Sequence, residues 1–452
     1  MNQHNTSTLI KNINIVNEGK IIIADVLIEN GVIQKIGKIH DGNKGHAIDG
    51  TGKYLLPGII DAQVHFREPG LTHKGDLYSE SKAAIAGGVT SFIDMPNTIP
   101  NVLTLELLQE KYTIAAEQSL ANFGFFLGVN GENLDEVIQL DNSKLLGVSD
   151  DGLYFTKKRN LLADNPLIME KLFANCKTII AIHAEKEQIV EANEHVFREK
   201  YGENVPIEFH PLIRSEEACY EATKEAIELA NKYKARLHIL HLSTAKETAL
   251  FRNDIPIAQK NITTEVTVQH LWFSDKDYHR LGTLIKWNPA IKTQKDQMGL
   301  LKALLDDRID IITTDHAPHL LEEKEQPYFQ SMSGGPMVQH SLNIMLELYK
   351  QGLISLEKIV EKMCHNPAIL YRIKNRGFIR EGYFADLAIV DLDASWVVSK
   401  ENILYKCAWS PLEGMRFHSR VTHSFVNGNL VYENGVFNEE ERGEALTMID
   451  KD

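Results

Sequence analysis

The feature that most constrains the fold of this chain is a regular alternation of short apolar segments with helical patterns between residues 58 and 370. Each apolar segment has the length of a buried strand, and the predicted strands are 59–65, 90–96, 123–129, 145–150, 178–183, 236–242, 263–269 and 309–314. Apolar periodicity predicts helices at 75–87, 104–118, 165–175, 215–233, 294–307 and 338–351. Strands that alternate with helices predict the α/β class and a (β/α)8 TIM-like barrel. A doubly wound sheet is the alternative, but it gives no reason for polar side chains at the ends of so many strands.

The two ends of the chain have a different pattern, which is rich in predicted strands. The pairs Asn30-Gly31 and Asn427-Gly428 lie between apolar segments and predict tight hairpin turns. Two β-rich ends around a different middle predict one small β-sandwich-like domain, formed jointly by residues 1–57 and 371–452. The barrel domain would then occupy residues 58–370.

The bulk composition excludes several kinds of partner. A formal net charge of −14 disfavours nucleic acid or an anionic membrane as the main partner, so a small anionic substrate would need a local positive clamp. The four cysteines are far apart and form no CxxC motif, which is typical of reduced thiols in a cytoplasmic protein. No apolar run approaches the roughly 20 residues that span a bilayer.

Histidines and carboxylates recur at the C-terminal ends of the predicted strands, where a barrel of this kind has its active site. These strand ends are His65 with Arg67, Asp94–Asn97, Ser149–Gly152, His183–Glu185, His241–Thr244 and Thr314–His319. Imidazoles and carboxylates together suit Zn²⁺ or a similar divalent ion that keeps a bound water. Such an ion makes a hydroxide nucleophile available near neutral pH, and Asp315 is the candidate general acid and base. The pattern predicts metal-assisted hydrolysis of an amide-like bond.

Six motifs resemble those of the dihydroorotases of the amidohydrolase superfamily, in type and in order. They are Phe66-Arg-Glu-Pro-Gly70, Met95-Pro-Asn97, Ser149-Asp-Asp-Gly152, His241-Leu-Ser-Thr244, Asn288-Pro289 and Thr314-Asp-His-Ala-Pro-His319. The resemblance runs from about residue 9 to residue 435. It implies a barrel of the metal-dependent amidohydrolase type. It also implies the reversible cyclisation of N-carbamoyl-L-aspartate to L-dihydroorotate and water in de novo pyrimidine (UMP) biosynthesis.

The resemblance also implies a role for each matching residue. One or two Zn²⁺ ions would be bound by His65, Asp151, His183, His241 and Asp315. Asp151 would bridge the ions, the role that some relatives give to a carboxylated lysine. The substrate carboxylate would be bound by Arg67, Asn97 and His319, and Asn288 would contact the ring. Arg67 suits this role physically, because its planar fork of donors matches a carboxylate.

One position departs from the family pattern. The family has His-x-His on the first barrel strand, whereas this chain has Gln63-Val64-His65. An amide oxygen is a poorer ligand for zinc than an imidazole, so Gln63 marks a weak or lost ligand position. Either Gln63 coordinates weakly, or one metal is bound firmly and the other loosely, or the protein is a non-catalytic relative.

Further alternatives stay open at this stage. Asp150, beside Asp151, could be the bridging carboxylate instead. A hydantoinase or allantoinase-like cyclic amidase would use the same chemistry, although a substrate without a carboxylate would leave Arg67 without a partner. A non-catalytic dihydroorotase-like subunit could bind another enzyme such as aspartate transcarbamoylase. A homodimer is also compatible with the sequence.

Overall fold

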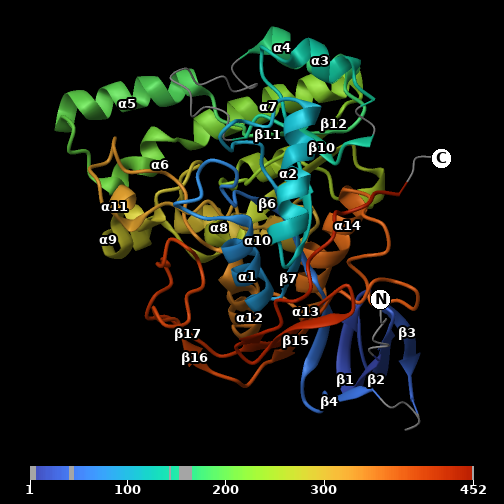
Figure 1. The fold of residues 1–452 in the computed structure, drawn as a ribbon. Helices are drawn as coiled ribbons and strands as arrows, with labels where there is room; N and C mark the ends of the chain where they lie inside the picture. The colour runs from blue at the N-terminus through green and yellow to red at the C-terminus, as the bar shows by residue number, and fades with distance from the viewer. Residues whose placement is uncertain (1–6, 40–44, 142–143, 152–164, 450–452) are drawn as a thin grey trace.

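In the computed structural model, parallel strands from the middle of the sequence form a ring (Figure 1). The structure describes residues 7–39, 45–141, 144–151 and 165–449. The ring consists of β6 (Ile59–Val64), β7 (Val89–Asp94), β8 (Asn122–Phe125), β9 (Leu127–Gly128), β10 (Gly147–Ser149), β11 (Ile179–Ile182), β12 (Arg236–Ile239), β13 (Ile262–Thr267) and β14 (Ile311–Thr313). β6, β7 and β8 pair in sequence order, and so do β9 to β14. β8 and β9 flank Phe126 as two halves of one strand position. Val64 pairs with His316 beyond β14, so the ring closes with eight positions.

The predicted (β/α)8 barrel is therefore confirmed, and all eight predicted strands are present. Every residue of β6, β7 and β11 is buried. Strands covered on both faces read as continuous apolar runs rather than as an alternating pattern, which is why the sequence located them.

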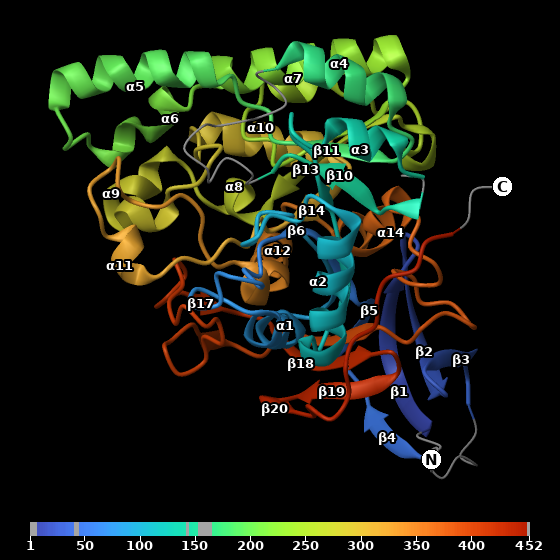
Figure 2. The ribbon, with the colours of Figure 1, turned by 45° about the horizontal axis from the view of Figure 1, so that its top comes forward.

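Helices surround the ring and connect its strands (Figure 2). They are α1 (Leu77–Ala86), α2 (Leu105–Gln118), α3 (Leu134–Gln139), α4 (Pro166–Asn175), α5 (Glu187–Tyr201), α6 (His210–Ile213), α7 (Glu216–Tyr233), α8 (Val268–Trp272), α9 (Tyr278–Leu281), α10 (Gln294–Leu305), α11 (Leu321–Lys324), α12 (Ser341–Lys350), α13 (Leu356–Val360) and α14 (Asn366–Leu370). Asn165 caps α4 and Ser215 caps α7, each by accepting a backbone N–H of the first turn. No helix within the described ranges has both the length and the apolar character needed to cross a membrane.

The six predicted helices are confirmed within a few residues at each end, but α5 was not predicted. Only Glu187 and Val190 of α5 are buried. Ile189, Phe197 and Tyr201 are partly buried and recur with Val190 at helical spacing, so a helical signal was present in the sequence and was missed.

The two ends of the chain form one sheet at the same end of the molecule (Figures 1 and 2). Its strands are β1 (Ser7–Asn17), β2 (Lys20–Glu29), β3 (Val32–Gly37), β4 (His46–Asp49), β5 (Tyr54–Pro57), β15 (Leu387–Asp391), β18 (Arg420–Val426), β19 (Asn429–Glu433) and β20 (Val436–Phe437). β5 lies between β1 and β15 and joins the N-terminal strands to the C-terminal ones. Asn30-Gly31 and Asn427-Gly428 have positive φ angles of 53°, 83°, 50° and 80°, as the predicted hairpin turns require. Both terminal regions of the chain therefore contribute strands to one nine-stranded sheet.

β16 (Trp396–Val397) and β17 (Arg416–Phe417) pair with each other outside this sheet. After β20 the chain returns to the barrel, where Ala445 pairs with Phe123 of β8.

A buried ion pair lies where the sheet meets the barrel. Arg376 and Asp386 are 3% and 4% exposed and form an ion pair. The other oxygen of Asp386 accepts hydrogen bonds from Asn122 of β8 at 3.2 Å and from the backbone N–H of Asn427 at 2.7 Å. One carboxylate therefore joins the barrel to strands from the C-terminal part of the sheet.

Replacing Asp386 with alanine would remove the buried counter-charge of Arg376 and leave only the exposed Glu444, at 3.4 Å, to pair with the guanidinium. We expect Asp386→Ala to lower the free energy of unfolding by about 3–5 kcal/mol, measured by urea denaturation. The control is Asp393→Ala, which removes the exposed Lys350–Asp393 pair and should change stability by less than about 1 kcal/mol. Equal, small effects of the two substitutions would show that the buried pair does not stabilise the junction.

Candidate metal centre

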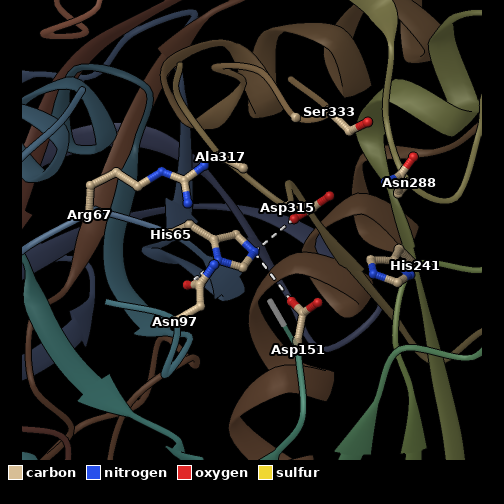
Figure 3. Close-up of a pocket in the computed structure, with 10 residues that line it drawn as sticks. His65, Arg67, Asn97, Asp151, His241, Asn288, Asp315, Ala317 and Ser333 are labelled. Atoms are coloured by element: carbon tan, nitrogen blue, oxygen red, sulfur yellow. Dashed lines mark hydrogen bonds and ion pairs between the residues drawn. The ribbon is translucent and has the colours of Figure 1, made fainter. Parts of the chain in front are cut away.

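His65 presents a nitrogen lone pair to two carboxylates (Figure 3). Its Nδ1 lies 2.8 Å from the amide oxygen of Asn97 and must donate, because that oxygen can only accept. Nε2 then carries the lone pair, 3.0 Å from Asp315 Oδ1 and 3.3 Å from Asp151 Oδ2. Acceptor atoms that converge in this way require a cation between them, either a proton or a metal ion.

The pKa shifts of His65, Asp151 and Asp315 also indicate that this site favours a bound positive charge. Burial alone would lower the pKa of His65, but the carboxylates of Asp151 and Asp315 outweigh burial and raise that pKa to about 10. Burial raises the pKa of Asp315 to about 6, against the opposing effect of His65. Burial also opposes ionisation of Asp151, yet His65, His241 and His183 together hold its pKa below the ordinary value.

A second group lies on the other side of Asp151. His183, after β11, has its Nδ1 3.1 Å from His241 Nε2 and 3.9 Å from Asp151 Oδ1. His183 Nε2 lies 2.7 Å from Glu185 and donates to it, which leaves the Nδ1 lone pair facing His241. Glu185 is in turn paired with Arg214. The carboxylate and the guanidinium therefore fix the orientation of the His183 ring.

Asp151 belongs to both groups of potential ligands. The ligand atoms of Asp151, His183 and His241 lie within 4.8 Å of one another, and so do those of His65, Asp151 and Asp315. Asp150 points elsewhere, since its Oδ1 accepts the backbone N–H of His183 at 3.1 Å. The geometry thus favours Asp151 over Asp150 as the shared carboxylate. The donor sets suit a divalent ion such as Zn²⁺.

Gln63 lies beside the centre, but its contact is a hydrogen bond. Its Nε2 donates to Asp151 Oδ2 at 3.1 Å. Its Oε1 is buried and has no hydrogen-bond partner among the described residues.

Two buried carboxylates hold the strand ends that carry these ligands. Glu265 of β13 accepts the backbone N–H of His241 at 3.3 Å, Thr313 Oγ1 at 2.9 Å and His238 Nε2 at 3.0 Å. Asp61 of β6 accepts Thr314 Oγ1 at 2.6 Å, directly before Asp315. Sequence reasoning assigned no role to Glu265 or Asp61. The available signal was a carboxylate inside an apolar strand, because such a group needs partners when it is buried.

The backbone is strained at the same level of the barrel. Arg67, His241 and Asp315 have positive φ angles of 70°, 33° and 46°. Side chains other than glycine rarely adopt this region, and such residues cluster at functional sites.

The candidate metal ligands open onto a small polar cavity of about 30 Å³. Its lining residues are His65, Arg67, Asn97, Asp151, His241, Asn288, Asp315, Ala317, Ser333 and Gly334. Figure 3 shows Arg67 on one side of His65 and His241 on the other. Asn288 Oδ1 has no hydrogen-bond partner among the described residues. Ser333 and Gly334 were not predicted as site residues.

Of the four predicted substrate-binding residues, Arg67, Asn97 and Asn288 line this cavity, whereas His319 lies behind Arg67. His319 Nε2 is 3.1 Å from Arg67 Nη2, and its Nδ1 is 3.1 Å from Lys74 Nζ. Burial and the neighbouring Arg67 hold the pKa of His319 well below its ordinary value, so a neutral ring accepts from the guanidinium. Pro318 O accepts from Arg67 Nε at 3.1 Å. These contacts fix the guanidinium at the edge of the cavity.

A closed parallel barrel with two overlapping ligand groups at its C-terminal strand ends is the architecture of a metal-dependent hydrolase. The sequence model of the amidohydrolase family matches residues 54–431. The chain belongs to the amidohydrolase family.

Two relatives and one solved structure are similar to this chain over most of its length. The chain is 33% identical to the dihydroorotase of Methanosarcina acetivorans over 90% of this chain and 88% of that protein. It is 32% identical to the dihydroorotase of Pyrococcus abyssi over 95% and 96%. Among solved structures, the L-hydantoinase (dihydropyrimidinase) of Arthrobacter aurescens superposes with a TM-score of 0.88 at 26% identity, covering 97% of this chain and 99% of that one.

Because Asp151 is shared by both ligand groups, its replacement should affect both. We expect Asp151→Asn to reduce bound zinc to a small fraction of the wild-type content, measured by elemental analysis after dialysis. Asp150→Asn makes the same chemical change at the adjacent residue and keeps an acceptor for the backbone N–H of His183. The zinc content of this variant should therefore stay close to that of the wild type. Loss of zinc from Asp150→Asn alone would reverse the assignment of the shared carboxylate.

Proposed function

We propose that this protein is a dihydroorotase, which catalyses the reversible cyclisation of N-carbamoyl-L-aspartate to L-dihydroorotate and water. The observation that carries the proposal is a fixed guanidinium, Arg67, across a polar cavity from two groups of metal ligands. Dihydroorotate has a carboxylate, which would pair with Arg67, and a cyclic amide, which would face the ligand groups. The dihydroorotases to which the chain is similar at 32–33% identity support this substrate.

The substrate carboxylate would be bound at one side of the cavity. Arg67 offers paired N–H donors, and its Nε and Nη2 already have partners that hold the plane of the fork. Asn97 donates from the amide nitrogen, because its oxygen is taken by His65. Asn288 Oδ1 would accept a ring N–H. A chain with a net charge of −14 needs such a local clamp for an anion.

The reacting amide would lie at the opposite side, next to the ligand groups. Zn²⁺ bound by His65, Asp151, His183, His241 and Asp315 would polarise the amide carbonyl and lower the pKa of a bound water. Asp315 would accept a proton from the water and return it to the ring nitrogen as the bond breaks. Burial raises the pKa of its carboxyl above the ordinary value, which favours uptake of a proton.

The proposal includes a place in de novo pyrimidine biosynthesis and a cytoplasmic location, as the resemblance to dihydroorotases implies. Zinc is the proposed metal, because imidazole and carboxylate ligands together suit it.

A hydantoinase is the second candidate, favoured by the superposition on the Arthrobacter aurescens enzyme. That comparison describes the barrel and the sheet, which related cyclic amidases share. It leaves unexplained why Arg67, 2% exposed, is oriented by Pro318 and His319 at the cavity. A substrate without a carboxylate would give this guanidinium no anion to bind in the cavity.

The first test is the loss of L-dihydroorotate absorbance with purified protein in buffer of defined zinc content. We expect turnover, and we expect Arg67→Met to lower kcat/KM for dihydroorotate by about 30-fold or more, since removal of a charge-paired contact costs about 2–5 kcal/mol. Dihydrouracil, which lacks the carboxylate, should be a poor substrate for both proteins. Arg380→Met removes an arginine paired at the surface with Glu18 and should leave turnover unchanged. Rapid turnover of dihydrouracil, unaffected by Arg67→Met, would favour the hydantoinase instead.

A second substitution tests the acid and base. Asp315→Asn keeps the shape of the side chain but cannot accept a proton, so kcat should fall by about 10²–10⁴-fold. Zinc content is measured on the same samples, because Asp315 also belongs to a ligand group. Retained zinc with lost turnover would support the proton-transfer role. Unchanged turnover would remove Asp315 from that role.

A further inference from the structure

Gln63 is the one residue of the centre whose chemistry differs from the family pattern, and its contacts are specific. The amide donates through Nε2 to Asp151 Oδ2 at 3.1 Å, and the side chain is 0% exposed. Rotating the amide by half a turn would place Oε1 against the carboxylate oxygen, two acceptors facing each other. The orientation of Gln63 is therefore set by Asp151.

This hydrogen bond affects only one oxygen of the shared carboxylate. Oδ2 is the oxygen near His65, at 3.3 Å, while Oδ1 faces His183. A lone pair that accepts from Gln63 is not available to an ion on the His65 side. An ion bound near His65 and Asp315 would therefore be coordinated less strongly by Asp151.

The two ligand groups also differ in composition and support. One combines two imidazoles with Asp151, whereas the other combines a single imidazole, His65, with two carboxylates. Imidazole is the better ligand for zinc. Behind His183 lies the Glu185–Arg214 pair, whereas His65 is supported by the neutral amide of Asn97. Partners of this kind change metal affinity by about 10–100-fold.

We propose that Gln63 is a positioning residue that anchors Asp151 by hydrogen bonding and is not a metal ligand, so that the centre binds two zinc ions with unequal affinity. The tighter position is that of His183 and His241, and the weaker is that of His65 and Asp315. This inference rests on the proposed metallohydrolase function, but it concerns metal binding and can be tested without substrate.

The experiment is a titration of metal-stripped protein with Zn²⁺ against a chromophoric chelator. Wild-type protein should bind in two steps separated by about 10-fold or more in affinity. His183→Ala should abolish the tighter step and His65→Ala the weaker one. Two steps of equal affinity, or the opposite assignment, would overturn the proposal.

Two substitutions of Gln63 separate anchoring from ligation. Gln63→His adds an imidazole and should bring the weaker step to within about 10-fold of the tighter one. Gln63→Leu removes a hydrogen bond rather than a ligand and frees the lone pair of Asp151 Oδ2 that Gln63 occupies, so neither step should lose affinity. If Gln63→Leu weakened only the His65 step, Gln63 would be a ligand and the proposal would be wrong.

Gln269→Leu is the matched control, because Gln269 is a fully buried amide on α8 whose side chain has no hydrogen-bond partner in the described ranges. It should leave both steps unchanged. Melting temperatures of all variants show whether each is folded. Dihydroorotate turnover is measured separately: two unequal steps without turnover would keep the metal inference and reject the proposed substrate, and turnover with equal steps would do the reverse.

Discussion

Lone pairs from His65, Asp151 and Asp315 face one another across distances of 3.0 and 3.3 Å at the C-terminal end of the barrel. Such an arrangement is unfavourable unless a cation lies between the acceptors, and burial removes the water that would otherwise screen them. The surrounding structure is arranged to maintain it. Asn97 and Glu185 fix which nitrogen of each ring carries a proton, while Asp61 and Glu265 tie down the strand ends. The barrel thus holds converging electron lone pairs in an arrangement that a bound divalent metal ion would stabilise.

The chain is similar both to dihydroorotases and to an L-hydantoinase, and the overall superposition does not distinguish the two. The distinction lies in a few side chains at the mouth. Arg67 emerges from a strained backbone position, and the neutral ring of His319 behind it accepts from the guanidinium without adding a second charge. Lys74 and Glu323 lie next along this chain of contacts, and Glu323 belongs to α11. The Arg67 guanidinium is therefore connected to a loop helix that does not line the cavity.

The sequence predicted those elements correctly whose residues all share one environment, such as burial on both faces of a strand. Strands buried on both faces appeared as apolar runs, and ligands appeared because they follow those strands directly. The helix α5, which is mostly exposed and has only a few partly buried apolar residues, was missed. The roles of Glu265 and Asp61 depend on which strands become neighbours, and that information exists only after the ring closes. For Gln63 the sequence showed the loss of a histidine, but only the fold shows that its amide turns its nitrogen towards Asp151.

The position of β5 between β1 and β15 has a consequence for how the chain is made. A ribosome releases the N-terminal strands first, and their partner β15 (Leu387–Asp391) follows only after the whole barrel has been synthesised. Until then the edge of β5 exposes unpaired backbone groups, the kind of edge that invites pairing with other chains. Completion of the sheet is thus a late event in biosynthesis, and the nascent protein must protect that edge throughout the translation of the catalytic domain.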